Sequence, residues 1–198
     1  MSENKKTVVL LRGGIDSTIC LAQAVKEFGK ENVIALNMYY GKVYKKERDA
    51  VKKIAEHYGV EYMEQNISKE DKSEVPFKNG LMIATATSFA LRIGAGQVEF
   101  AVHADESSGH AHPDCREGFY RAMATAVHTG TDGEVKLVLP FADMSKKQVM
   151  QLGKKLEVPF ELTWSCHVDS DKACGECMGC KGRAEAFKLI NEEDPIMK

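Results

Sequence analysis

The sequence lacks a long apolar run and a leader-like start. None of its 198 residues lies in a stretch both apolar and long enough to span a bilayer. The polar residues 1–6 are not followed by the apolar core and small-residue cleavage site of a signal peptide. We therefore expect a cytoplasmic protein that does not bind membranes.

An excess of positive charge is also missing. The 27 Lys and Arg residues face 29 Asp and Glu residues, which leaves a formal net charge of −2. Such a balance gives no overall basic surface for nucleic acid, so we expect no nucleic-acid partner. Repeats, low-complexity tracts and clear linkers are absent as well. The length suits one core, and the only boundary we expect lies near residue 163, between an ATP-binding domain (1–162) and a cysteine-rich segment packed on it (163–198).

Short apolar runs alternate with amphipathic stretches along the chain. Strands are predicted at residues 7–11, 33–38, 60–67, 98–102 and 135–139. Helices are predicted at residues 17–28, 45–58, 79–93, from 114, 145–156 and 182–191, with capping boxes at Asp114/Glu117 and Ser145/Gln148. This order predicts an α/β fold with a parallel, five-stranded, doubly wound sheet. Ligands of such sheets bind beyond the carboxyl ends of the strands.

A glycine-containing loop follows the first predicted strand. It reads Leu11-Arg12-Gly13-Gly14-Ile15-Asp16-Ser17-Thr18. Two glycines let backbone N–H groups approach a ligand closely, and the start of the next helix favours an anion. The loop lacks the Walker lysine and the G-x-G-x-x-G spacing. It predicts a phosphate-binding site, and the alternative is a simple turn with a helix cap.

Four of the six cysteines gather near the C-terminus. Their spacing is C-x7-C-x2-C-x2-C, from Cys166 through Cys174 and Cys177 to Cys180. Four thiolates are typical of a closed, structural zinc site. An iron–sulfur cluster is the main alternative, because C-x2-C runs also bind such clusters. Free thiols are the remaining alternative.

Several motifs together resemble one family. The glycine loop is similar to the PP-loop, S-G-G-x-D-S, of enzymes that cleave ATP between the α and β phosphates, with Arg12 in place of serine. The T-W-S-C run at 163–166 and the C-G-x-C-x-x-C-x-x-R run at 174–183 resemble the tail of the 7-cyano-7-deazaguanine synthase (QueC) family. The segments at 40–42, 76–79 and 112–116 also resemble that family, with lysine, lysine and histidine at positions where it has other residues.

The resemblance implies an activity. The family converts 7-carboxy-7-deazaguanine, ammonia and ATP into the nitrile through an acyl adenylate and an amide. It implies ATP, Mg²⁺ and Zn²⁺ as cofactors, and a homodimer. Arg12 departs from the family pattern, and it either binds a phosphate with its two-pronged guanidinium or blocks the site.

The resemblance also assigns roles. Residues 11–18 are expected to bind ATP, with Asp16, Ser17 and Lys146 as the catalytic group. The expected substrate-binding residues are Lys78, Asp105, Glu106, Asp114 and Arg116. The alternative role of Asp16 and Asp114 is helix capping. The alternative for Lys78, Arg116 and Lys146 is that they are ordinary solvated surface cations. We expect no metal at His110 and His112, a packed thiol at Cys115, and a packing or dimer role for Arg183.

Three other functions fit parts of the pattern. One is a relative that stops at the amide or adenylates another acid. A second is a tRNA thiolase with an iron–sulfur cluster, against which the missing RNA-binding domain argues. A third is a zinc-binding module that has lost ATP through Arg12.

Overall fold

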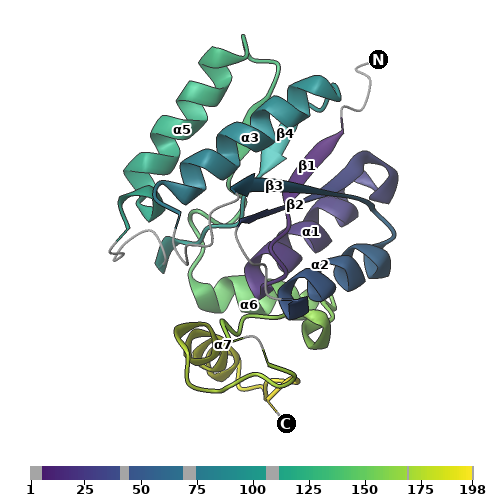
Figure 1. Ribbon diagram of the computed structural model, residues 1–198, viewed down its shortest axis with the longest axis vertical. Coiled ribbons are helices and arrows are strands. Elements are labelled where there is room, and N and C mark those ends of the chain that lie inside the picture. Colours follow the sequence, from purple (N-terminus) through teal and green to yellow (C-terminus); the bar gives the residue numbers. More distant parts are fainter. Residues whose placement is uncertain (1–5, 41–44, 69–74, 106–111, 169, 198) are drawn as a thin grey trace.

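One parallel sheet with helices on both faces forms the body of the protein (Figure 1). The computed structural model describes residues 6–40, 45–68, 75–105, 112–168 and 170–197. The strands are β1 (Thr7–Leu10), β2 (Val33–Tyr40), β3 (Glu61–Ser68), β4 (Gln97–Glu99) and β5 (Lys136–Val138). They pair in parallel in the order β3-β2-β1-β4-β5. The predicted five-stranded, doubly wound sheet is therefore confirmed.

The helices divide between the two faces because successive strand residues point to opposite sides. The helices are α1 (Ile15–Phe28), α2 (Lys45–Tyr58), α3 (Lys78–Arg92), α5 (Glu117–Gly130), α6 (Lys146–Lys155) and α7 (Met178–Leu189). Val9 and Leu11 belong to a core shared with α1, α2, α6 and α7. Val8 and Leu10 belong to a second core, shared with α3 and α5. The two apolar cores pack against both faces of the sheet, and they thereby hold the end of β1 in place.

Two predicted helix starts differ from the structure by three residues or more. The helix expected from Asp114 begins at Glu117 with Arg116 as an N-cap that makes no side-chain cap, so the predicted Asp114/Glu117 capping box is wrong. Asp114 lies instead in the short helix η2 (Pro113–Cys115). The last helix begins at Met178 rather than at residue 182, because the Cys177 sulfur accepts the N–H of Cys180 and caps it.

The capping box at Ser145/Gln148 is confirmed. Ser145 accepts the N–H of Gln148, while the Gln148 side chain accepts the N–H of Ser145. This reciprocal pair fixes the start of α6, whose first residue is Lys146.

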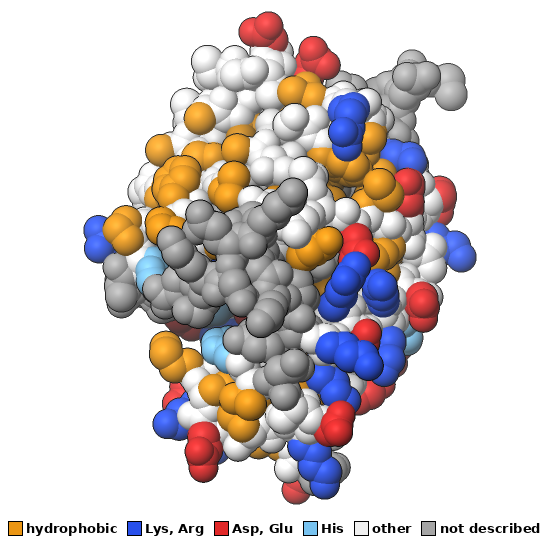
Figure 2. Space-filling model, viewed as in Figure 1, with side chains coloured by type: hydrophobic (Ala, Val, Ile, Leu, Met, Phe, Trp, Pro, Cys, Tyr) orange, Lys and Arg blue, Asp and Glu red, His pale blue; other side chains and the backbone are white. Residues whose placement is uncertain are grey.

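Charges of both signs are interspersed on the surface. Figure 2 shows basic side chains gathered over α2 with acidic ones among them.

Within the described ranges, no helix has both the length and the apolar character needed to cross a membrane.

Candidate functional site

The glycine loop joins β1 to α1 at the carboxyl edge of the sheet. Gly13 has φ +77°, and a Cβ there would lie 3.0 Å from Val51 Cγ2 and 3.2 Å from the Glu47 carbonyl oxygen. Around Gly14, in contrast, an added Cβ meets nothing within 4 Å. One glycine therefore packs against α2, while the other leaves the outer side of the loop open to a ligand.

Hydroxyl groups hold this loop closed. The N–H of Arg12 donates to Ser17 Oγ (3.1 Å), and the Ser17 hydroxyl donates to the Gly14 carbonyl (3.2 Å). Thr18 Oγ1 also donates to that carbonyl (2.8 Å). The N-cap of α1 is Gly14, which offers no side-chain cap, so Asp16 does not serve as the cap. The first turn of α1 thus has backbone N–H groups that an anion can accept.

Lys146 lies beside the loop. Its Nζ is 2.5 Å from Asp16 Oδ1, and the side chains are 18% and 28% exposed. Asp105 Oδ2 accepts the backbone N–H of Lys146 (2.7 Å). This pairing makes Lys146 a positioned cation next to the loop rather than a freely solvated lysine.

A second charged group lies at the starts of α2 and α3. Burial raises the pKa of Glu47, and the nearby Arg12, His167 and Lys78 lower it by a smaller amount. Burial also lowers the pKa of Lys78, the charge of Arg12 lowers it further, and Cys115, Asp114 and Glu47 act in the opposite direction. The charges of the loop, α2 and α3 thus act on one another, and the first turn of α2 packs against Gly13 of the loop. Glu47 was not among the predicted site residues.

Asn79 ties the start of α3 to η2. Its backbone N–H donates to Asp114 Oδ2 (2.9 Å), and its Nδ2 lies 2.9 Å from the Asp114 carbonyl, 3.4 Å from Cys115 Sγ and 3.1 Å from the Tyr120 hydroxyl. The Asp114 carboxylate therefore holds the first turn of α3, as Asp105 holds that of α6. The buried Asn79 Oδ1 has no partner in the described part of the chain.

The remaining predicted residues are spread more widely. Arg116 is exposed at the start of α5. Glu106 and His110 lie outside the described residues. His112 is exposed, and Cys115 is half-buried.

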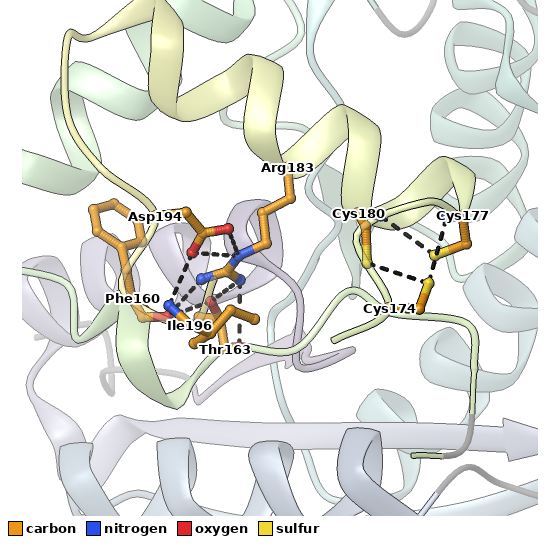
Figure 3. A network of polar contacts seen from close by, with 8 residues as sticks. All are labelled: Phe160, Thr163, Cys174, Cys177, Cys180, Arg183, Asp194 and Ile196. Atoms are coloured by element: carbon orange, nitrogen blue, oxygen red, sulfur yellow. Dashed lines mark hydrogen bonds and ion pairs between the residues drawn. The ribbon is translucent and has the colours of Figure 1, made fainter. Parts of the chain in front are cut away.

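The four tail cysteines converge, as the spacing predicts. Their Sγ atoms all lie within 4.8 Å of one another, with 3.9 Å between Cys174 and Cys180 and 4.0 Å between Cys166 and Cys177. A tetrahedral ion with metal–sulfur bonds of about 2.3 Å separates its sulfurs by about 3.8 Å. The donor set therefore fits a single metal ion, and Figure 3 shows three of the sulfurs facing one another.

Backbone N–H groups surround these sulfurs. Those of Val168 and Cys174 donate to Cys166 Sγ, and that of Cys177 donates to Cys174 Sγ, each at 3.4 Å. Burial raises the pKa of Cys177, but the N–H groups of His167 and Cys180 outweigh it and bring the pKa to about 6. Burial and the facing sulfurs raise the pKa of Cys180 to about 12. The lowered pKa favours the thiolate form of Cys177, and the raised pKa favours the protonated form of Cys180. A bound metal cation is therefore needed to keep all four cysteines in the thiolate form.

The tail also contacts the glycine loop. The N–H of Trp164, two residues before Cys166, donates to the Gly13 carbonyl (2.8 Å). The buried Arg183 holds the same tail segment (Figure 3). It donates to both carboxylate oxygens of Asp194 (2.9 and 2.8 Å). It also donates to Thr163 Oγ1 (2.6 Å) and to the Phe160 carbonyl (3.0 Å). Arg183 thus has the packing role that the sequence predicted.

Solved structures of two other enzymes share the fold. A U34-tRNA thiolase from Methanococcus maripaludis, solved with its [4Fe-4S] cluster, matches with a TM-score of 0.62 and 19% identity over 96% of this chain and 66% of its own. An NMN synthetase from Francisella tularensis matches with a TM-score of 0.57 and 18% identity over 96% of this chain and 78% of its own. At these identities the similarity concerns the fold alone.

Sequence relatives are much closer. Proteins described as 7-cyano-7-deazaguanine synthase are 36% identical in Koribacter versatilis, over 96% of this chain and 92% of the relative, and 37% identical in Methanoculleus marisnigri, over 97% and 98%. The relative from Archaeoglobus fulgidus is 35% identical, over 97% and 90%. The model of the queuosine biosynthesis protein QueC matches residues 6–73 and 61–191. The chain therefore belongs to the QueC family.

Proposed function

We propose that this chain is an ATP-dependent C–N ligase that converts 7-carboxy-7-deazaguanine and ammonia into 7-cyano-7-deazaguanine. The observation that carries the proposal is the open glycine loop with the Asp16–Lys146 pair beside it, at the carboxyl end of β1. The names of the family relatives supply the substrate and product.

The loop would bind the phosphates of ATP. The first turn of α1 follows Gly14 directly, and its backbone N–H groups together with the charge of Lys146 beside Asp16 favour an anion. The Asp16 carboxylate, on the first turn of α1, is the group that would hold Mg²⁺. Bound Mg²⁺ would supply charge neutralisation for the leaving pyrophosphate.

The reaction needs two adenylations. In the first, a carboxylate oxygen attacks the α-phosphorus and pyrophosphate leaves. Ammonia then attacks the acyl carbon, the bond to AMP breaks, and a proton is lost to give the amide. In the second, the amide oxygen attacks another α-phosphorus and pyrophosphate leaves. Loss of AMP and two N–H protons then gives the nitrile, so the protein chiefly positions the reactants and offsets charge.

Zinc is the metal we assign to Cys166, Cys174, Cys177 and Cys180. A four-iron cube would hold its cysteine sulfurs farther apart, because each sulfur binds a different iron, whereas these sulfurs lie within 4.8 Å of one another. A closed four-thiolate site is structural and contributes on the order of 10 kcal/mol to folding. We propose that residues 163–198 form a metal-binding segment. Its Trp164 N–H donates to the Gly13 carbonyl and so helps to hold the glycine loop.

The substrate would lie between the glycine loop and the starts of α3, α5 and α6. Lys78 and Arg116 are our candidates for its carboxylate, and Asp105, Glu106 and Asp114 for the N–H groups of its purine-like face. The Asp114 carboxylate accepts the Asn79 N–H at one oxygen and has further lone pairs for a ligand.

We further propose a cytoplasmic homodimer that binds small molecules and neither nucleic acid nor membranes. The overall balance of 27 Lys and Arg against 29 Asp and Glu residues supports the absence of a nucleic-acid partner. A shallow depression lined by Gln65, Ala84, Thr85, Ser88, Phe89 and Arg92 makes the outer side of α3 our candidate for the dimer contact. Light scattering coupled to gel filtration tests this assembly.

Arg12 favours one second candidate, an enzyme that stops at the amide. Arg12 stands where the PP-loop pattern has serine. With a different side chain in the ATP-binding loop, the enzyme of this second candidate adenylates the acid but not the amide.

One assay separates these functions. The protein is incubated with 7-carboxy-7-deazaguanine, ATP, Mg²⁺ and ammonium, and acid, amide and nitrile are measured by mass spectrometry beside released pyrophosphate. Reactions without ATP, and with Asp16→Asn, are the controls. Nitrile supports the main proposal, amide alone selects the second candidate, and unchanged acid without pyrophosphate overturns both.

A further inference from the structure

Phe77 is an exposed aromatic residue at the start of α3. It is 61% exposed and precedes the helix as its N-cap. Its backbone has φ +56° and ψ +35°, in the left-handed region that a bulky residue rarely occupies. Burial of the ring does not offset the cost of this conformation, because most of the residue is in contact with solvent. A position that is both strained and exposed is typical of a residue that contacts a ligand.

Two neighbouring groups hold the Phe77 ring in place. The ring lies over the first turn of α3, where a Cβ on Gly80 would overlap three of its atoms. The Phe119 ring meets it edge to face, with 5.5 Å between the ring centroids and 84° between the planes. Phe119 in turn packs against the buried Tyr120, with 5.4 Å between the ring centroids. Support from both α3 and α5 therefore makes the exposed ring a fixed platform.

A carboxylate lies close to this platform. Asp114 accepts the backbone N–H of Asn79 at Oδ2 (2.9 Å), and Asn79 is two residues after Phe77. The same two parts of the chain, residues 77–79 and 114–119, meet again where the Phe77 and Phe119 rings touch. Asp114 is only half-buried, so its carboxylate can accept further hydrogen bonds. An aromatic surface and a hydrogen-bond acceptor thus lie together between the starts of α3 and α5.

These two groups fit one kind of ligand. An aromatic side chain stacks on a flat heterocycle, and a carboxylate accepts two parallel N–H bonds from adjacent donors. The purine-like substrate of the proposed function has a flat ring, with a ring N–H beside an amino group. The adenine of ATP has an amino group beside ring nitrogens that are acceptors, so it cannot donate two such bonds to a carboxylate. The deazaguanine ring is therefore the better match.

We propose that Phe77 is a specificity-determining residue whose ring stacks on the deazaguanine ring, while Asp114 accepts the N–H groups at the edge of that ring. This inference rests on the proposed function and adds to it the surface that selects the substrate. Stacking involves no covalent change. The acid and the amide have the same ring, so Phe77 contributes equally to the binding of both. It contributes nothing to the binding of ATP.

Two substitutions at Phe77 separate stacking from general apolar contact. Phe77→Leu keeps an apolar side chain and the strained backbone but removes the ring, whereas Phe77→Tyr keeps the ring. Titration calorimetry measures binding of the acid, 7-carboxy-7-deazaguanine, alone and with the non-cleavable α,β-methylene analogue of ATP. The Kd for the acid should rise about 5- to 150-fold in Phe77→Leu, the equivalent of about 1–3 kcal/mol for one stacked ring, and less than about 3-fold in Phe77→Tyr. The Kd for the analogue should change by less than about 3-fold in both.

Fluorescence gives a second readout, which a purely structural role of Phe77 would not change. Trp164 is the one tryptophan of the chain, so Phe77→Trp places a second indole at the platform. Saturating acid should quench the added emission, because the substrate ring then stacks on that indole. Leu91, an exposed apolar residue of the same helix, provides the controls. Leu91→Ala should leave both Kd values unchanged, and the emission added by Leu91→Trp should not respond to the acid. Thermal melts verify that every variant is folded.

Three outcomes overturn the inference. An unchanged Kd for the acid in Phe77→Leu removes the ring from the substrate site, and a different oligomer in light scattering would then make Phe77 a subunit contact. A weaker Kd for the ATP analogue alone places adenine on the ring. Equal losses of acid binding in Phe77→Leu and Phe77→Tyr, with lowered melting temperatures, make the ring a structural support of α3. Failure of the proposed function looks different, because the wild-type protein itself then binds no acid, and the inference fails with it.

Discussion

The ammonium group of Lys146 lies 2.5 Å from Oδ1 of Asp16 and joins the first turn of α6 to the first turn of α1. The two residues are 130 positions apart in the chain. The capping box at Ser145/Gln148 and the contact of Asp105 with the N–H of Lys146 fix the start of α6, so the ammonium is held beside the glycine loop. A cation placed before the reaction needs no reorganisation as charge develops.

Replacing Lys146 with methionine is therefore expected to lower the rate of pyrophosphate release by about 10²–10³-fold, the usual cost of losing one preorganised charge or donor. The stability should change by about 1 kcal/mol or less, because the pair is partly exposed. Single-turnover assays of pyrophosphate and urea melts measure the two effects. Lys147→Met, at the exposed neighbour, is the control. A loss of less than 3-fold would show that the cation has no part in the chemistry.

The order of strands and helices could be predicted from the sequence because it depends on local pattern. Helix α2 was predicted with its observed bounds, since the apolar residues Ala50, Val51, Ile54 and Ala55 form one stripe that ends before Gly59. The cysteine cluster was predictable for a similar reason, because its ligands are close in sequence. Even there, the start of α7 was missed, because a sulfur and not a hydroxyl caps it.

The arrangement around the loop was harder to predict because it depends on long-range contacts. Asp114 and Glu117 have the spacing of a capping box, yet the Asp114 carboxylate accepts the N–H of Asn79, 35 residues away. No local signal distinguishes these two partners. Glu47 was overlooked because only the fold brings the first turn of α2 against Gly13 of the loop.

The cysteine cluster makes a prediction about metal content. Cys180→Ser removes a ligand that is buried among three other sulfurs, so bound zinc should fall from one ion per chain to well below half. The melting temperature should fall by more than 10 °C, because metal binding is coupled to folding of the tail. Elemental analysis and calorimetry measure both effects, and Cys115→Ser is the control. A brown protein with iron and sulfide would contradict the assignment of zinc.

Glu99 makes a prediction about pH. This buried residue of β4 accepts from Cys20 Sγ (3.4 Å) and Gln97 Nε2 (2.9 Å). Burial raises its pKa to about 7, and the two hydrogen bonds only partly offset that effect. The folded protein therefore holds a proton that the unfolded chain has lost, so Glu99 makes stability fall as pH rises from about 4.5 to about 7.

Glu99→Gln should remove this part of the pH dependence. The variant is expected to gain stability relative to wild type between pH 5 and pH 7, by up to about 3 kcal/mol, and to show a constant difference above pH 8. Urea melts at pH 5, 6, 7 and 8 provide the measurement. The exposed Glu134→Gln serves as the charge control. A difference that does not vary with pH would mean that Glu99 is ionised in the folded protein throughout this range.

The two loop glycines are expected to respond differently to alanine. At Gly13 a Cβ would press on Val51 and on the Glu47 carbonyl, and φ is +77°, so Gly13→Ala should cost about 1–3 kcal/mol of stability. At Gly14 φ is −82° and the space is open, so Gly14→Ala should change stability by less than about 0.5 kcal/mol. The new methyl would nevertheless stand where we place the phosphates. Urea melts paired with ATP titrations should thus separate a folding defect in Gly13→Ala from a nucleotide-binding defect in Gly14→Ala, and normal ATP affinity in Gly14→Ala would place the phosphates elsewhere.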